Sequence, residues 1–572
     1  MELPQEAVSE QLGRILASRG FRLSERMQRF LTYCVEAAQR GETPKEYAVG
    51  TAVFDRKPDF DPRVDPIVRV EARRLRAKLE EYYSDSGAND EIVIELPKGG
   101  YIPVLRRRER RQLAAEARTS IAVLPFANLG PGGDEDYFSD GLTEELIHRL
   151  TRVPGLRVVA WPSASRLRGR ETDLGGIRDQ LKVSLVVRGS VRRSGGRVRI
   201  TAQLVDAPSG EFRWSESYSR DMSDLLAIQE EIAGAIAATL KLALNQPGRI
   251  VTANVESHSL CLKGRYIAWR RTIESLRKSI AFYEQAAEAD PGNAVAYAGM
   301  ADGYILLSEY GDMPPSEAMD HARQAALKAL ELDPFSAEAH TSLAMIRSHA
   351  EWDWAEAGAL YRKALDLNPG YVRARHWYGL DYLAVLGRFD NAEEQLEAAR
   401  ELDPLSPIIL EGGAYLQMYR RNYERAIAEL QAIAELEPSF HKAYTAMGRV
   451  YSLQGRCREA LEMFDRGLSH GGESPSLIAA IGQVSALLGD RAKALECLER
   501  LKRMSRGRHV PMASFAILYL GLGDHEESLA CLERSAERRE SNVVSIGVHP
   551  LFDPLRGEPR FHNLLRRIGF LP

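Results

Sequence analysis

Five basic side chains lie close together near the N-terminus, between positions 69 and 78. At 3.6 residues per turn, Arg69, Arg73 and Arg76 share one face of a helix. Arg74 and Lys78 lie beside that face. Arginine presents planar, forked donors that suit phosphate groups and guanine edges. We therefore expect the first three residues to read DNA, and Arg74 and Lys78 to contact phosphates.

A helix must position these side chains, and its other face is apolar. Val68, Ala72, Leu75 and Leu79 follow the spacing i, i+4, i+7, i+11, which predicts a core-facing stripe. Asp65 is a suitable N-cap, and Pro66 suits the first helical position. Residues 91–104 then alternate and turn at two glycines, which predicts a terminal hairpin. Charge pattern alone also fits a solvated helix face, but a hairpin directly after the helix favours DNA binding.

The segment from Val68 to Leu79, followed by Lys98-Gly99-Gly100-Tyr101, resembles the recognition helix and wing of OmpR/PhoB-type winged-helix domains. The resemblance covers about residues 31–105. It implies a helix that enters the major groove of double-stranded DNA and a wing in which Lys98 is a further contact. The position of the module first in the chain is similar to that in ToxR/CadC-like regulators.

In residues 119–245, short apolar runs typical of strands alternate with segments of helical spacing. We expect strands at 120–126 and 156–160, helices at 137–147 and 173–181, three strands within 185–218 and a last helix at 225–242. This βαβα order, followed by a β-meander and a helix, predicts a small α/β sandwich.

Three stretches of this segment resemble the TolB amino-terminal-like domain: Ala122-Val123-Leu124-Pro125-Phe126, Tyr137-Phe138-Ser139-Asp140-Gly141-Leu142 and Gly189-Ser190-Val191-Arg192-Arg193. In bacterial regulators, such a domain commonly lies between a DNA-binding module and tetratricopeptide repeats. The family carries no settled catalytic assignment. The resemblance therefore implies a coupling or dimerising domain, and a nucleotide or small-ligand sensor is a further hypothesis.

A period of 34 residues runs through the C-terminal part of the chain. It relates Gly387, Arg421, Gly455, Gly489 and Gly523, and five residues after each stands Ala392, Ala426, Ala460, Ala494 or Ser528. Helix, glycine turn and helix, with a small residue where the helices approach, resemble the tetratricopeptide repeat. About seven repeats are expected in 250–545. The resemblance implies an all-α solenoid whose concave surface binds a protein partner.

The chain of 572 residues is thus predicted to be multidomain, with α and α/β parts. The predicted order is a winged helix (1–104), a charged linker (105–118), the TolB-like domain (119–245), the repeat array (250–545) and a capping segment (546–572). The net charge of −4 does not by itself indicate nucleic-acid binding.

Residues that could support catalysis do not form a recognisable set. Leu129 to Asp134 is rich in glycine but lacks the Gly-Lys-Ser/Thr of a phosphate-binding loop, and neither GxSxG nor HExxH occurs. Glu144 and Glu145 are interpreted as helix-dipole partners near a helix start. We expect no enzymatic activity, no cofactor and no metal. The five scattered cysteines are interpreted as reduced core thiols.

The sequence contains no apolar run of about twenty residues and no secretory signal pattern, so we expect a cytoplasmic protein without a membrane anchor. The resulting hypothesis is a bacterial-type transcriptional regulator that binds DNA through its first domain, receives a protein signal through its repeats and can form a homodimer. The competing hypothesis is a tetratricopeptide scaffold that does not bind DNA.

Overall fold

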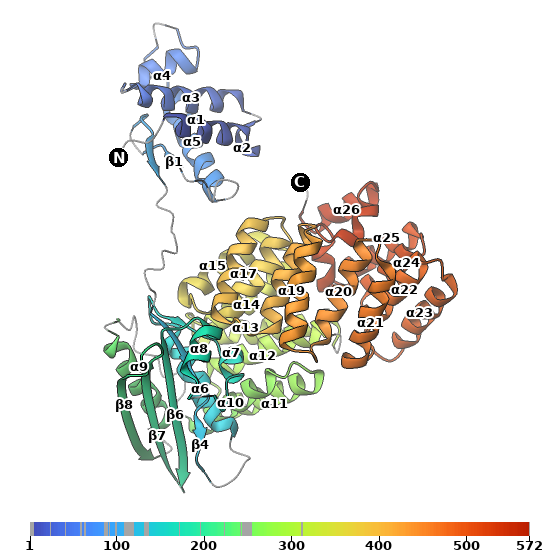
Figure 1. Cartoon of the computed structure of the whole chain (residues 1–572). Coiled ribbons are helices and arrows are strands. Elements are labelled where there is room, and N and C mark those ends of the chain that lie inside the picture. The colour runs from blue at the N-terminus through green and yellow to red at the C-terminus, as the bar shows by residue number, and fades with distance from the viewer. Residues whose placement is uncertain are drawn as a thin grey trace. The chain divides into compact units, whose positions relative to one another are not determined.

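The computed structural model describes three stretches of the chain (Figure 1). These are residues 5–107 except 23, 41, 58, 59, 62, 63, 85–89, 91, 98 and 99; residues 119–242 except 131–135, 171, 195, 222, 223 and 241; and residues 254–570 except 311 and 312. The chain divides into two compact units, Met1–Ala117 and Arg118–Pro572. We call them the N-terminal and the C-terminal unit.

The N-terminal unit contains helices followed by a hairpin. Its elements are α1 (Gln5–Ala17), α2 (Arg19–Arg22), α3 (Glu25–Gln39), α4 (Glu46–Val53), α5 (Ile67–Ser84), β1 (Ile92–Glu95) and β2 (Val104–Arg107). The strands are antiparallel, with Ile94 opposite Leu105. Val68, Ala72 and Leu75 of α5 are fully buried, and they pack with Phe30 of α3. The apolar face predicted for this helix is confirmed.

Two boundaries differ from the prediction. Helix α5 begins at Ile67, one residue later than expected, and the carboxylate of Asp65 accepts the Ile67 N–H at 3.1 Å. Pro66 therefore precedes the helix. Strand β2 extends to Arg107, so Leu105 to Arg107 belong to the hairpin and not to the linker. The rest of the predicted linker lies outside the described residues.

The α/β part of the C-terminal unit contains the predicted elements in the predicted order, together with strand β4 (Ala127–Asn128) and helix α7 (Trp161–Ser165), which were not predicted. As observed, the predicted elements are β3 (Ser120–Val123), α6 (Asp136–Leu150), β5 (Arg157–Val158), α8 (Leu174–Leu181), β6 (Leu185–Ser194), β7 (Arg197–Asp206), β8 (Phe212–Asp221) and α9 (Leu225–Thr239). The sheet order is β5-β3-β6-β7-β8, and β4 pairs with β6. Strand β3 is parallel to β5 and β6, whereas β6, β7 and β8 are antiparallel. The strand expected at 156–160 is shorter than predicted.

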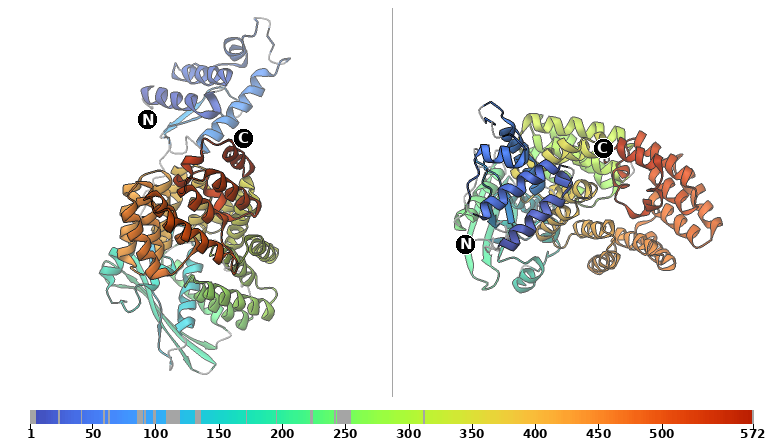
Figure 2. Two further views of the ribbon diagram at one scale, coloured as in Figure 1. Left: turned by 90° about the vertical axis from the view of Figure 1, so that its right-hand side faces the viewer. Right: turned by 90° about the horizontal axis from the view of Figure 1, so that it is seen from above.

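Helical pairs make up the rest of the unit. Between residues 254 and 537, the described residues form eight antiparallel pairs of consecutive helices. The first four pairs are α10 (Val255–Ala268) with α11 (Ile273–Ala289), α12 (Ala294–Glu309) with α13 (Pro315–Leu332), α14 (Ala337–Ile346) with α15 (Trp354–Leu367), and α16 (Val372–Trp377) with α17 (Phe389–Leu402). The last four pairs are α18 (Pro407–Tyr419) with α19 (Tyr423–Leu436), α20 (His441–Leu453) with α21 (Cys457–Gly471), α22 (Pro475–Leu487) with α23 (Arg491–Met504), and α24 (Met512–Gly521) with α25 (His525–Glu537). Helices α14 and α16 continue as π-helices η3 (Arg347–Glu351) and η4 (Tyr378–Ala384). We expected about seven repeats, so the array is one pair longer. Figure 2 shows that it is curved.

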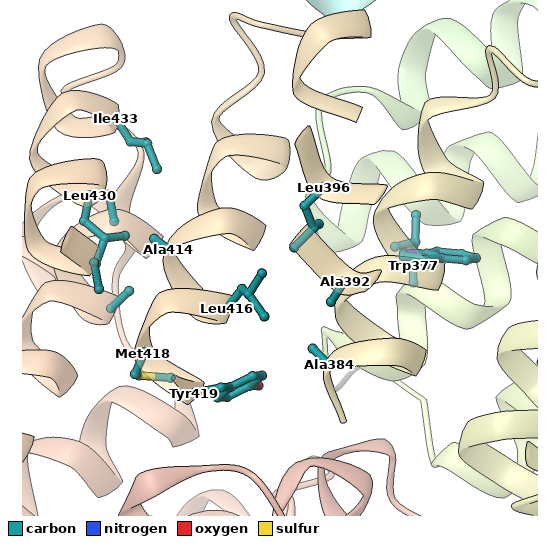
Figure 3. Packing of buried hydrophobic residues seen from close by; sticks show 14 of the residues in the cluster. Trp377, Ala384, Ala392, Leu396, Ala414, Leu416, Met418, Tyr419, Leu430 and Ile433 are labelled. Carbon is teal, nitrogen blue, oxygen red and sulfur yellow. The ribbon is translucent and has the colours of Figure 1, made fainter. Parts of the chain in front are cut away.

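The periodic residues have the roles that the repeat requires. The small residue of each period is fully buried: Ala392, Ala426, Ala460, Ala494 and Ser528. The residue at the turn has a positive φ in every period, between 64° at Arg421 and 88° at Gly489. Figure 3 shows part of the core, where Ala392 and Leu396 of α17 lie beside Leu416 of α18. Close helix approach and left-handed turns therefore explain the period of 34.

The segment after the last pair covers the end of the array. It contains two 3₁₀-helices, η5 (Ser541–Ser545) and η6 (Pro550–Leu555), and α26 (Pro559–Arg567). Phe552 and Phe561 are buried in the same core as Phe515 of α24. The segment therefore packs against the last helical pair.

Candidate nucleic-acid interface and the repeat surface

Helix α5 presents Arg69, Arg73 and Arg74 as exposed side chains on the side away from the core of the N-terminal unit. Arg73 is exposed, and within the described part of the chain it has no ion-pair or hydrogen-bond partner. Arg69 pairs with Glu46 of α4 at 3.1 Å, and Arg74 pairs with Glu71 of its own helix at 2.8 Å. Both arginines are largely exposed, so solvent screens these pairs. All three guanidinium groups can reach an external phosphate.

Arg76 has a different environment from the one expected. Its guanidinium donates to the backbone carbonyls of Leu96 at 3.0 Å, Pro97 at 2.9 Å and Gly100 at 3.2 Å. These carbonyls belong to the loop between β1 and β2. Arg76 therefore ties the hairpin to α5, and its donors are directed toward the protein. The helical spacing alone could not reveal this partner.

The two lysines predicted to contact DNA are Lys78 and Lys98. Lys78 is half-buried, with its ammonium 5.9 Å from the centre of the Phe21 ring. Lys98 lies outside the described residues. A pocket of about 540 Å³ beside Lys78 and Arg74 is also lined by Arg26, an exposed residue of α3. Arg26 was missed because only the packing of α3 on α5 brings it to this surface.

In the C-terminal unit, a buried joint connects the α/β part to the repeats. Ser163 of α7 donates its backbone N–H to the Asp403 carboxylate at 3.0 Å, and its hydroxyl donates to the same oxygen. The Ser163 hydroxyl also accepts the N–H of Leu405 at 2.8 Å. The backbone N–H of Ala160 donates to the carbonyl of Leu402 at 2.8 Å. Burial raises the pKa of Asp403 to about 6. These contacts attach α7 to the end of α17.

Helix α6 packs against the first helical pair and forms the second part of this interface. Trp269 donates its indole N–H to Glu144 at 3.1 Å, and Arg265 pairs with Glu145 at 3.4 Å. His148 lies 3.4 Å from Glu338 of α14. Burial raises the pKa of Glu144 to about 7 and lowers that of His148 to about 4.

This arrangement corrects the interpretation of the two glutamates. Glu144 and Glu145 are in the middle of α6, which begins at Asp136, so the dipole at the helix start does not explain them. They are interface residues. Glu145 also pairs with Arg149 of its own helix at 3.3 Å. The partners from α10 and its C-cap are ones that the sequence of α6 does not reveal.

Half-buried charged side chains connect helices of the array that are distant in sequence. Lys442 of α20 lies 4.7 Å from the ring centre of Tyr310, which follows α12. Arg449, also on α20, lies 3.5 Å from the Tyr415 hydroxyl of α18. Arg373 of α16 pairs with Asp302 of α12. The first helices of several pairs thus meet across a polar surface.

The C-terminal segment also contacts the middle of the array. Trp354 of α15 donates its indole N–H to the carbonyl of Ile568 at 2.7 Å, and Arg421 pairs with Asp553 at 2.7 Å. The predicted capping segment therefore crosses back to repeats far from the end it covers. A period of 34 residues contains no information about such a contact.

The described stretches contain no group of three or more His, Cys, Asp or Glu that could hold a metal, and no helix long and apolar enough to cross a membrane. All five cysteines are free, and Cys34, Cys261, Cys497 and Cys531 are buried. This agrees with their interpretation as core thiols.

Comparisons with known proteins identify the repeats. The tetratricopeptide repeat family model matches residues 353–407, 379–439 and 412–478. "Putative adenylate cyclase 3" of Rhizobium meliloti is 32% identical over 46% of this chain and 48% of its own length. "Transcriptional regulator HilA" of Salmonella typhimurium is 22% identical over 50% of this chain and 51% of its own length. The chain therefore spans about half the length of the curated relatives it matches.

Among solved structures, PilF of Pseudomonas aeruginosa is 23% identical with a TM-score of 0.30, and the match covers 38% of this chain and 94% of that one. A tetratricopeptide repeat protein from Parabacteroides merdae is 16% identical with a TM-score of 0.35, covering 47% of this chain and 99% of that one. The family match and the helical pairs together establish that the C-terminal unit carries tetratricopeptide repeats.

Proposed function

We propose that the protein is a DNA-binding transcriptional regulator whose N-terminal unit is a winged helix. The observation that carries this proposal is the outer face of α5, where Arg73 is exposed without a partner among the described residues. Arg69 and Arg74 lie on the same helix in screened surface pairs. A helix presenting arginines in this way can donate to phosphates and to base edges in a major groove.

The hairpin supports the same proposal. Arg76 binds three carbonyls of its loop and so holds the hairpin beside α5. In this arrangement Arg76 positions the wing, while Arg69, Arg73 and Arg74 face the DNA. Lys78 remains a proposed phosphate contact, and Lys98 remains a proposed DNA contact.

The repeats and the α/β part are proposed to carry the regulatory signal. The repeat array is the proposed site for a protein partner, as is usual for helical repeats, and the half-buried Lys442 and Arg449 are polar side chains of that array. The joint between Ser163 and Asp403 would transmit a change in the repeats to the TolB-like part. The similarity to a transcriptional regulator supports this function. We place the regulator in the cytoplasm, where its DNA is, and include no enzymatic activity in the proposal.

The test is binding of the full-length chain to genomic DNA fragments, its own upstream region included, at several salt concentrations. We expect selective binding, and an Arg73→Ala variant that binds its preferred fragment at least about tenfold more weakly. Arg40→Ala is the matched control. Arg40 is an exposed arginine at the C-terminal end of α3, whereas Arg26, beside α5, is at the N-terminal end. Equal affinity for all fragments, or unchanged affinity of Arg73→Ala, would contradict the proposal.

The competing function is a tetratricopeptide scaffold that does not bind DNA. The specific observation in its favour is the family match, which lies entirely within the repeats. In that case, the full-length chain would bind no fragment at low salt, and the repeats alone would account for the protein's interactions.

A further inference from the structure

One face of the β-meander is open to solvent. On the inward face, Val191, Ile200, Ala202 and Tyr218 are buried, and they share a core with Ile232 of α9. Because successive residues of a strand point to opposite sides, the residues between them form an outward face. Figure 1 shows strands β6, β7 and β8 side by side.

The register of the strands gives the composition of this outward face. Its four rows, across β6, β7 and β8, are Arg188–Gln203–Ser215, Ser190–Thr201–Ser217, Arg192–Arg199–Ser219 and Ser194–Arg197–Asp221. The Thr201 and Ser217 hydroxyls are 2.9 Å apart, and Arg188 donates to Gln203 at 3.3 Å. These contacts confirm that the side chains of a row share one side of the sheet. The rows contain four arginines and one acidic residue.

Two of the arginines lie opposite each other without an acidic partner among the described residues. Arg192 and Arg199 are directly opposite on neighbouring strands, and both are exposed. Neither forms an ion pair or hydrogen bond with a described residue. Like charges directly opposite on a sheet destabilise it. The one acidic residue of the rows, Asp221, lies 3.9 Å from Arg197.

We propose that this outward face of β6, β7 and β8, which we call the arginine face, binds the phosphate backbone of duplex DNA. The inference rests on the proposed function and adds a second DNA contact in the other unit. Its argument is charge complementarity: unpaired arginines stand among serine, threonine and glutamine side chains, and these residue types donate to phosphate oxygens at protein–DNA interfaces. The chain as a whole has a net charge of −4, so this attraction is local.

The same face is less suited to single-stranded RNA. Recognition of unpaired bases relies on aromatic platforms on which the bases stack. Phe212, the first residue of β8, is an exposed aromatic residue, and the Arg188 guanidinium already lies 5.4 Å from its ring centre. Apart from the carboxylate of Asp221, the outward rows present hydroxyl, amide and guanidinium groups, which contact a backbone independently of its sequence.

The test compares full-length variants on a duplex of mixed sequence at several salt concentrations. Arg192→Ser with Arg199→Ser removes the opposed pair and should fold, because serine already occupies neighbouring positions of the face. Loss of two phosphate contacts should make the log–log salt slope about 1.8 less negative and lower the affinity at least about tenfold at 0.1 M salt. Arg458→Ser with Arg466→Ser on α21 is the control, since both arginines are exposed and the charge change is equal.

The outcomes separate the two proposals. A slope and affinity equal to those of the control pair would overturn the arginine face, while sequence preference lost in Arg73→Ala would still support α5 as the reader. Preference unaffected by Arg73→Ala, with a slope that depends on Arg192 and Arg199, would overturn the assignment of α5 instead. Tighter binding to single-stranded RNA than to duplex DNA through the same two arginines would overturn the choice of ligand.

Discussion

Ser163 and Asp403 are 240 positions apart in the sequence, and they form the buried link between the α/β part and the repeats. The Asp403 carboxylate accepts two hydrogen bonds from Ser163, while the Ser163 hydroxyl accepts one from the N–H of Leu405. Both side chains are almost completely buried. A buried hydroxyl with donor and acceptor partners is costly to remove, because the partners left behind lose their hydrogen bonds.

We predict that Ser163→Ala lowers the free energy of unfolding of the C-terminal unit by about 1–3 kcal/mol. The Asp403 carboxylate and the Leu405 N–H would each lose a buried partner. Thermal and denaturant unfolding of the full-length chain measures this change. Ser165→Ala is the matched control, because Ser165 lies in the same helix and, among the described residues, its hydroxyl bonds only to the carbonyl of Pro162. Equal effects of the two substitutions would contradict the role of the joint.

The contrast between this joint and the repeats indicates what the sequence could predict. The small residue at Ala460 and the glycine turn at Gly455 are local requirements of a helical pair, so their period revealed the array. The basic face and apolar stripe of α5 follow from helical spacing in the same way. In the sequence, Asp403 is an aspartate at the end of a helix, with nothing to distinguish it. Its contact with Ser163 depends on how the α/β part packs against the repeats, which neither segment reveals alone. Arg76 was assigned to DNA because helical spacing does not reveal loop carbonyls.

Arg76 and Arg73 should respond differently to substitution. We predict that Arg76→Ala lowers the free energy of unfolding of the N-terminal unit by about 1.5–3 kcal/mol, because charge-assisted bonds to three carbonyls are lost. Arg73→Ala should change it by less than about 0.5 kcal/mol, since Arg73 is exposed. Denaturant unfolding followed by a probe in the N-terminal unit distinguishes them. Equal stability of the two variants would contradict the assignment of Arg76 as a positioning residue.

Gly455 tests the conformational origin of the repeat period. Its φ is 75°, and an added Cβ would meet nothing within 4 Å, so only backbone strain opposes alanine there. We predict that Gly455→Ala lowers the free energy of unfolding by about 1 kcal/mol. Gly507→Ala is the control, because an added Cβ there also meets open space but the φ is not in the left-handed region. That variant should be neutral or slightly stabilising in thermal unfolding. A loss of the same size at both positions would contradict the explanation.

Buried histidines should make the repeats sensitive to acid. Burial lowers the pKa of His349 from its ordinary 6.5 to about 4, so the folded state keeps the ring neutral where the unfolded chain protonates it. Stability from this group is present above pH 6.5 and is lost as the pH falls toward 4. One such histidine accounts for about 1 kcal/mol between pH 7 and 5.5, and about 3 kcal/mol by pH 4. The pKa values of His376 and His549 are also lowered by burial, to about 3, so these residues add to the trend.

We predict that His349→Gln makes the dependence of unfolding free energy on pH less steep by up to one proton between pH 6.5 and 4, whatever its effect at neutral pH. Urea unfolding at half-unit pH steps gives the slope directly. His525→Gln is the control, because it makes the same substitution at an exposed position at the start of α25. If His349→Gln and the wild type lose stability with the same slope, the buried ring is protonated in the folded state and the prediction is wrong.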